Sequence, residues 1–172
     1  MRFRRRATAD IRTMAALFAA AEEEAARAGE PMPAAEHLLL AALGLPEGSA
    51  RRAFERAGAD PDRFRRAVDD QHADALRSVG LEPSDEAIDA HLPPPGRPRG
   101  PLRTTASAQE LFQQVAATAR AERSEIRGAH VVLVAAGAEG GTTVRALRHM
   151  GIDLVQMQAA ARAELDQPGT TT

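Results

Sequence analysis

The chain has 172 residues, 44% of them hydrophobic, and a formal net charge of −2, which suits one soluble globular domain or two small lobes that share a core. It contains no cysteine, so disulfides, thiol catalysis and cysteine-ligated zinc are excluded. No apolar run approaches the roughly 20 residues of a membrane span, so we expect a cytoplasmic protein with no membrane partner.

The first expected element is a helix with one apolar stripe. Its inward-facing residues recur at three- and four-residue spacing: Ile11, Met14, Leu17, Phe18 and Ala21. The start of the chain, "MRFRRR", places four arginines where they could bind the phosphates of a nucleic acid. The acidic net charge and the absence of Trp and Tyr make nucleic-acid binding the weaker hypothesis.

Three more helices are expected in the first part of the chain. Residues 38–43, "LLLAAL", are apolar on every side, which predicts the buried centre of this half. A helix over about 49–57 should end at Gly58, because glycine accepts the left-handed conformation that ends many helices. The next helix should begin with Asp60 as its N-cap and Pro61 at the first helical position.

A link then spans about residues 69–103. It includes the end of a helix, a turn at Gly80 and a short helix that begins near residues 83–84. The stretch "PPPGRPRGPLR" predicts an extended, solvent-facing strap. His72 and His91 fall in this link, isolated from other candidate ligands, so no metal site is expected.

The second half of the chain repeats the first at an offset of 93 residues. The stretch "AEHLLLAALGLPEGSARRAFERAGAD" recurs as "GAHVVLVAAGAEGGTTVRALRHMGID". Identical residues recur at five key positions: His37 with His130, Gly44 with Gly137, Arg52 with Arg145, Gly58 with Gly151 and Asp60 with Asp153. Duplication explains this pattern. We therefore expect an all-α single domain over 1–172, with repeats over about 8–68 and 104–165 and a frayed tail over 166–172.

These residues resemble the double Clp repeat of the N-terminal domain of Clp unfoldases, in particular the ClpC-like branch, whose repeats carry a Glu-His-hydrophobic signature. The resemblance covers nearly the whole chain and implies two four-helix repeats related by a pseudo-twofold axis. It also implies a domain that receives substrates and adaptors. No G-x-x-x-x-G-K-[ST] loop can exist in these 172 residues, which contain no lysine, so we expect the ATPase modules of the family to be missing. A free-standing binding domain is therefore expected.

The resemblance also implies a pocket for phosphorylated arginine in each repeat. A carboxylate can accept paired hydrogen bonds from a guanidinium, and Glu36 stands at that position in the first repeat. Ala129 replaces it in the second repeat. The threonine that the family carries near the first helix falls at Ile11 in one repeat, whereas Thr104 or Thr105 could fill the position in the other. Each repeat thus keeps at most part of the pocket.

His37 and His130 are the remaining candidates for ligand binding. Each stands at the start of an apolar helix, so the pair could bind a ligand or transfer protons. A histidine that bonds to the helix backbone and fixes each repeat is the interpretation that the duplication favours. Glu36 could likewise either bind a ligand or serve as a capping or solvated carboxylate at the start of the helix.

No enzymatic activity and no cofactor are expected. The chain has serines and five histidines, but it lacks a nucleophile-elbow sequence and an H-E-x-x-H motif. The sequence therefore predicts a non-enzymatic binding domain with Clp unfoldases, their substrates or adaptors, or peptide-like ligands as partners. It could act as an adaptor that delivers cargo or as a decoy that captures cyclic peptides. The alternative is an Arg-tailed regulator that binds nucleic acid.

Overall fold

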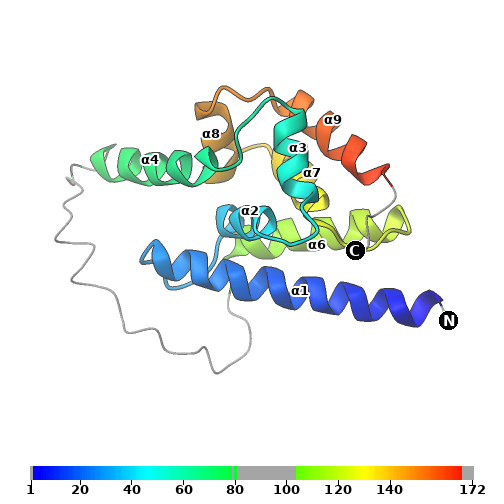
Figure 1. Cartoon of the computed structure of the whole chain (residues 1–172). Coiled ribbons are helices and arrows are strands. Elements are labelled where there is room, and N and C mark those ends of the chain that lie inside the picture. Colours follow the sequence, from blue (N-terminus) through cyan, green and yellow to red (C-terminus); the bar gives the residue numbers. More distant parts are fainter. Residues whose placement is uncertain (1, 79, 81–103, 168–172) are drawn as a thin grey trace.

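The computed structural model describes residues 2–78, 80 and 104–167, and every regular element in these ranges is an α-helix (Figure 1). In chain order the helices are α1 (Arg2–Arg27), α2 (Ala35–Leu43), α3 (Ser49–Arg56), α4 (Arg63–Ser78), α6 (Ala106–Ala121), α7 (Gly128–Ala136), α8 (Thr142–His149) and α9 (Leu154–Leu165). The predicted all-α fold class is thus confirmed. The strap at 93–103, the short helix near 83–84, His91 and most of the tail lie outside the described residues.

The helices of the two halves pack against each other in a reciprocal way. Helices α2 and α7 contact at the centre, α3 packs against α9, and α4 packs against α8 (Figure 1). Because α8 and α9 correspond to α3 and α4 in the repeat, the last two contacts are equivalent. A two-fold relation between the halves requires such a pair of equivalent contacts. The pseudo-twofold axis itself stays a prediction.

The helix ends repeat in the same way. Gly58 and Gly151 both adopt positive φ, at 73° and 76°, in the turns that follow α3 and α8. Asp153 caps α9 by accepting hydrogen bonds from the backbone N–H groups of Val155 and Gln156. In the first half, Asp60 Oδ1 accepts from the N–H of Asp62, and α4 begins at Arg63. Helix α4 therefore starts two residues after the predicted Pro61.

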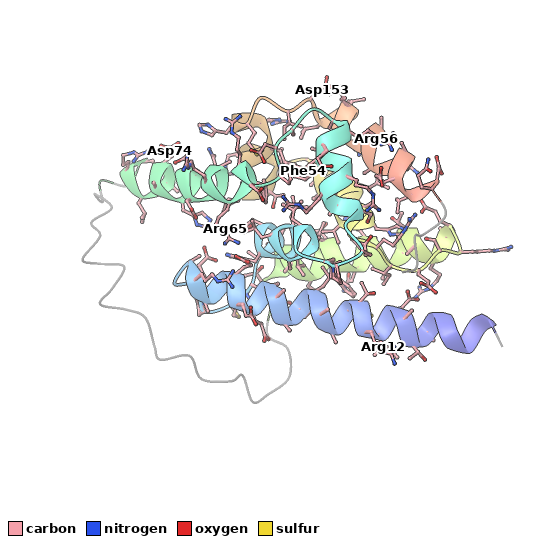
Figure 2. The ribbon with its side chains drawn as sticks, in the orientation of Figure 1. Arg12, Phe54, Arg56, Arg65, Asp74 and Asp153 are labelled. Atoms are coloured by element: carbon pink, nitrogen blue, oxygen red, sulfur yellow. The ribbon has the colours of Figure 1, made fainter. Side chains whose placement is uncertain are left out.

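The core consists mainly of small and medium side chains, with few aromatic rings. Phe54 of α3, labelled in Figure 2, is fully buried and meets Phe64 of α4 edge-on, with ring centroids 6.0 Å apart. Phe18 of α1 packs against Phe112 of α6 at 4.8 Å. Alanines on most of the helices fill the space between these contacts, which lets the helices approach closely.

One residue of α1 differs from the sequence prediction. Ile11 is 65% exposed, so its predicted place on the inward face of α1 is wrong. Its neighbour Asp10 takes that place, because Asp10 Oδ1 accepts a hydrogen bond from the N–H of Ile126 at 2.9 Å. Helix α4 continues to Ser78, so the helical end expected in the link covers residues 69–78.

Candidate functional site

A cavity of about 880 Å³ opens between the start of α2, one face of α6 and the loop that joins α7 to α8. Its polar lining comes from all three places and includes Glu36, Ser107, Thr142, Thr143 and Arg145. The volume lies in the range of small-ligand and short-peptide pockets. The cavity is therefore a candidate binding site.

A chain of hydrogen bonds holds α6 against the start of α2 at the edge of this cavity. The backbone N–H of Ala35 donates to Ser107 Oγ at 3.4 Å, and Ser107 Oγ lies 3.0 Å from Thr105 Oγ1. Thr105 Oγ1 caps α6 and donates to the carbonyl oxygen of Pro33 at 3.2 Å. The hydroxyl group of Thr105 therefore makes its hydrogen bonds within the contact between α6 and the segment before α2. Ser107, which the sequence prediction did not single out, is the hydroxyl that lines the cavity.

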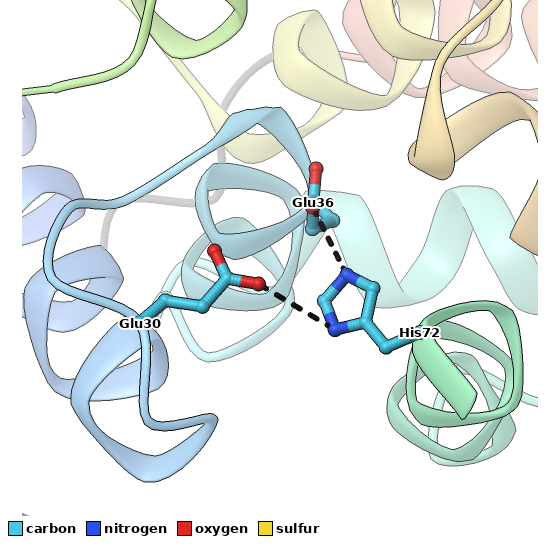
Figure 3. A group of neighbouring side chains, drawn as sticks. All are labelled: Glu30, Glu36 and His72. Carbon is cyan, nitrogen blue, oxygen red and sulfur yellow. Dashed lines mark ion pairs between the residues drawn. The ribbon is translucent and has the colours of Figure 1, made fainter. Parts of the chain in front are cut away.

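Glu36 forms one wall of the cavity and is held there by an ion pair. Its Oε1 lies 3.4 Å from His72 Nε2 of α4, while His72 Nδ1 lies 3.5 Å from Glu30 Oε1 (Figure 3). The hydrogen bond to Glu36 raises the pKa of the His72 imidazole against the opposing effect of burial. Burial alone would raise the pKa of Glu36, but the bonds to His72 and to its own backbone outweigh burial and lower it.

The prediction that His72 is isolated from other candidate ligands is wrong. One ligand atom from each of Glu30, Glu36 and His72 lies within 4.8 Å of the others, which is close enough for a metal ion. The ring of His72 stands between the two carboxylates, with one nitrogen facing each (Figure 3). A metal ion would need one ring nitrogen to converge with both carboxylates, so this arrangement fits a shared proton donor better. The sequence analysis missed this cluster because its residues come from separate segments of the chain. Glu30 precedes α2, Glu36 lies in α2, and His72 lies in α4.

His37 and His130 occupy equivalent, architectural positions. His37 Nδ1 accepts the backbone N–H of Ala34, and His130 Nδ1 accepts that of Arg127, both at 3.0 Å. The two rings are about 1% and 0% exposed, and burial lowers the pKa of each. Each imidazole thus closes the first turn of its helix, as the sequence favoured, and neither lines the cavity.

The remaining predicted residues are less informative. Thr104 precedes the N-cap of α6 and does not line the cavity. Ala129, which replaces the second carboxylate, is fully buried. The side chains of the basic start, 1–6, lie outside the described residues. None of the described helices is both long and apolar enough to cross a membrane.

Thr143 and Arg145 are cavity residues that the sequence prediction missed. Thr143 is 4% exposed, and its Oγ1 has no hydrogen-bond partner among the described residues. Arg145 was noted only as the repeat partner of Arg52. Thr143 stands where the first repeat has Ala50, so comparing the unequal positions of the two repeats could have singled it out. Arg145 is identical to its counterpart Arg52, and such a comparison would not have found it.

Comparison with known proteins supports the same fold. Residues 12–88 match the family model of the Clp repeat (R) N-terminal domain. No curated protein matches the chain. Among solved structures, the chain is similar to the crystal structure of the N-terminal domain of the caseinolytic protease-associated chaperone ClpD from Arabidopsis thaliana. The sequences are 21% identical, the TM-score is 0.57, and the match covers 92% of this chain and 95% of that one. Residues 12–88 thus carry a Clp repeat, and the chain has the fold of a Clp unfoldase N-terminal domain.

Proposed function

We propose that this chain is a non-enzymatic binding domain that receives peptide segments or peptide-like ligands in the cavity between α2, α6 and α8. In Clp unfoldases a domain of this fold receives substrates and adaptors. The observation that carries the proposal is the 880 Å³ cavity with a buried carboxylate, Glu36, fixed in its wall by His72. Such a wall could bind a guanidinium or a backbone N–H group of the ligand.

A binding role fits the composition of these residues. The 172 residues contain no lysine, so they cannot form the phosphate-binding loop of an unfoldase motor. Of the candidate site residues, only Glu36 lines the cavity, while His37, His130 and Thr105 are engaged in helix ends. The chain would therefore act by holding a ligand.

Two roles in Clp-dependent proteolysis follow from such binding. An adaptor would bind both a cargo and a Clp unfoldase and bring them together. A decoy would bind only the ligand, such as a toxic cyclic peptide or a group like phosphoarginine, and keep it from the unfoldase. Affinity capture from a cell extract distinguishes them, because only an adaptor recovers the unfoldase.

Calorimetric titration with peptides, with and without phosphoarginine, tests the binding proposal directly. We expect Glu36→Gln to weaken binding at least about tenfold, because it removes the charge in the cavity wall. Glu30→Gln is the matched control, since Glu30 also pairs with His72 but does not line the cavity. Equal effects of the two variants would show that the cavity is not the site. Salt-dependent binding of duplex DNA that is lost when residues 2–6 are removed would favour the nucleic-acid alternative.

A further inference from the structure

One carboxylate, that of Glu47, bridges the start of α3 and the start of α7. Its Oε2 accepts the backbone N–H of Ser49 at 3.0 Å, and its Oε1 accepts the N–H of Gly128 at 2.7 Å. Ser49 Oγ donates to Glu47 Oε1 at 3.0 Å and accepts the N–H of Ala129 at 2.9 Å. The N–H groups at two helix starts, where the helix dipoles favour an anion, are thus satisfied by one side chain.

The equivalent place in the other half has no such carboxylate. The offset of 93 residues puts Gly140 at the position of Glu47, and it pairs α8 with α3 and α2 with α7. The N-caps of α2 and α8, Ala34 and Gly141, make no side-chain capping bond. Gly140 and residues from the first turns of both helices line the cavity. The start of α2 is held by Ser107 Oγ, which accepts the N–H of Ala35, and by His37 Nδ1, which accepts that of Ala34. The start of α8 has no side-chain cap and faces the same open space.

The two halves also differ at the first residue of the central helix. A Cβ atom on Gly128 would come within 2.9 Å of Ala50 Cβ and 3.0 Å of Glu47 Oε1, so α3 and α7 approach closely only because that residue is glycine. At the equivalent position in α2 stands Ala35, which lines the cavity. The start of α2 thus accommodates a Cβ atom where the start of α7 would not.

Thr143 and Arg145 are two polar side chains in this space with donors to offer a ligand. Thr143 is almost completely buried, and its Oγ1 makes no hydrogen bond within the described ranges. Arg145 corresponds to Arg52, which binds the carboxylate of Glu164, but Gln71 stands at the position equivalent to Glu164. Arg145 donates to Thr142 Oγ1 at 3.2 Å and forms no ion pair with a carboxylate in the described part of the chain.

We propose that the cavity between the starts of α2 and α8 binds one carboxylate of a peptide, at the place that Glu47 fills in the other half. The N–H groups at the start of α8, the Thr143 hydroxyl and the Arg145 guanidinium supply its donors. The lining also contains Glu36, Glu110 and Glu139, which disfavours polyacidic segments. The negative charge of Glu36 is offset by His72, so a single carboxylate can be accommodated. This inference rests on the proposed peptide binding and names the group that is recognised.

The test uses nuclear magnetic resonance titration of the full chain with three acetylated tripeptides. Gly-Ala-Ala with a free C-terminus carries an α-carboxylate, Gly-Asp-Ala amide carries a side-chain carboxylate, and Gly-Ala-Ala amide carries none. We expect one or both carboxylate probes to bind at least about tenfold more tightly than the uncharged amide. The difference between the two carboxylate probes identifies whether a chain end or an acidic side chain is preferred.

Gly140→Glu provides the second arm, because it supplies the missing carboxylate from the chain itself. Nothing lies within 4 Å of a Cβ atom built at Gly140, so the side chain can enter. Relative to Gly140→Gln, we expect a melting temperature higher by a few degrees and carboxylate-probe binding about tenfold weaker. Equal melting temperatures of these two variants, or equal binding of all three tripeptides, would overturn the inference. Equal binding that is still lost in Glu36→Gln would leave the proposed peptide binding intact.

Discussion

Glu164 of α9 accepts a hydrogen bond from Arg52 Nε of α3 at 2.8 Å, and only 3% of its side chain is exposed. Arg56, labelled in Figure 2, donates to the same carboxylate at 2.8 Å. We expect Glu164→Gln to lower the free energy of unfolding by about 1–3 kcal/mol, because two half-exposed guanidinium groups lose a buried acceptor charge. Urea denaturation measures this change.

The control for Glu164 is Asp62, whose pair with Arg51 is solvent-exposed, with 72% and 40% of the side chains accessible. Asp62→Asn should cost about 0–1 kcal/mol, because water screens an exposed pair. Similar losses in Glu164→Gln and Asp62→Asn would contradict a special role of Glu164 in joining the two halves.

The sequence predicted the parts of the fold that duplication preserves. Glycines 58 and 151, the cap at Asp153 and the two buried histidines follow from identical residues at one offset, since the same local chemistry produces the same helix ends. The cavity could not be predicted in this way. It depends on positions where the repeats differ, such as Gly140, and on which helices meet across the halves, which no local pattern encodes.

The ion pairs of His72 should make stability depend on pH. Its pKa is raised in the folded protein, so its stabilising effect is complete below about pH 6.5 and is lost as the pH rises through the folded-state pKa. We expect the difference in unfolding free energy between the wild type and His72→Gln to shrink between about pH 5.5 and about pH 8.5. Chemical denaturation at a series of pH values measures it.

A matched histidine separates this effect from a general loss of charge. His149 lies 3.5 Å from Asp70, but both side chains are about half exposed, at 52% and 50%. His149→Gln should change stability little at any of these pH values. A pH dependence in His149→Gln as large as that in His72→Gln would argue against the Glu36–His72–Glu30 cluster as its source.

Restoring the missing carboxylate of the second repeat should destabilise the protein. Ala129 is fully buried, and the residue equivalent to His72 is Leu165, so a carboxylate at 129 would lack the cation that balances Glu36. The nearby Arg127 donates instead to the backbone oxygens of Leu165 and Gln167. We expect Ala129→Glu to cost about 2 kcal/mol or more, measured by thermal unfolding.

The double variant Ala129→Glu, Leu165→His tests this explanation. If the missing cation is the cause, the second substitution should recover part of the stability lost by the first, and more of it at lower pH, where imidazole is protonated. Additive losses in the double variant would mean that packing at Ala129, not charge, excludes the carboxylate. The result would also explain why Glu36 has no counterpart in the second repeat.

Two glycines should respond oppositely to the addition of one methyl group. In Gly128→Ala the new Cβ would lie 2.9 Å from Ala50 Cβ and 3.0 Å from the carbonyl oxygen of Ala42, both in tightly packed helices. Separating α3 from α7 should lower the free energy of unfolding by about 1–3 kcal/mol.

In Gly140→Ala the methyl group meets nothing within 4 Å, so the variant should be neutral or more stable by up to about 1 kcal/mol, because the unfolded chain loses conformational freedom. Urea denaturation compares the two variants. A cost in Gly140→Ala as large as that in Gly128→Ala would mean that α8 and α2 are packed as closely as α3 and α7, and no room for a ligand would remain between them.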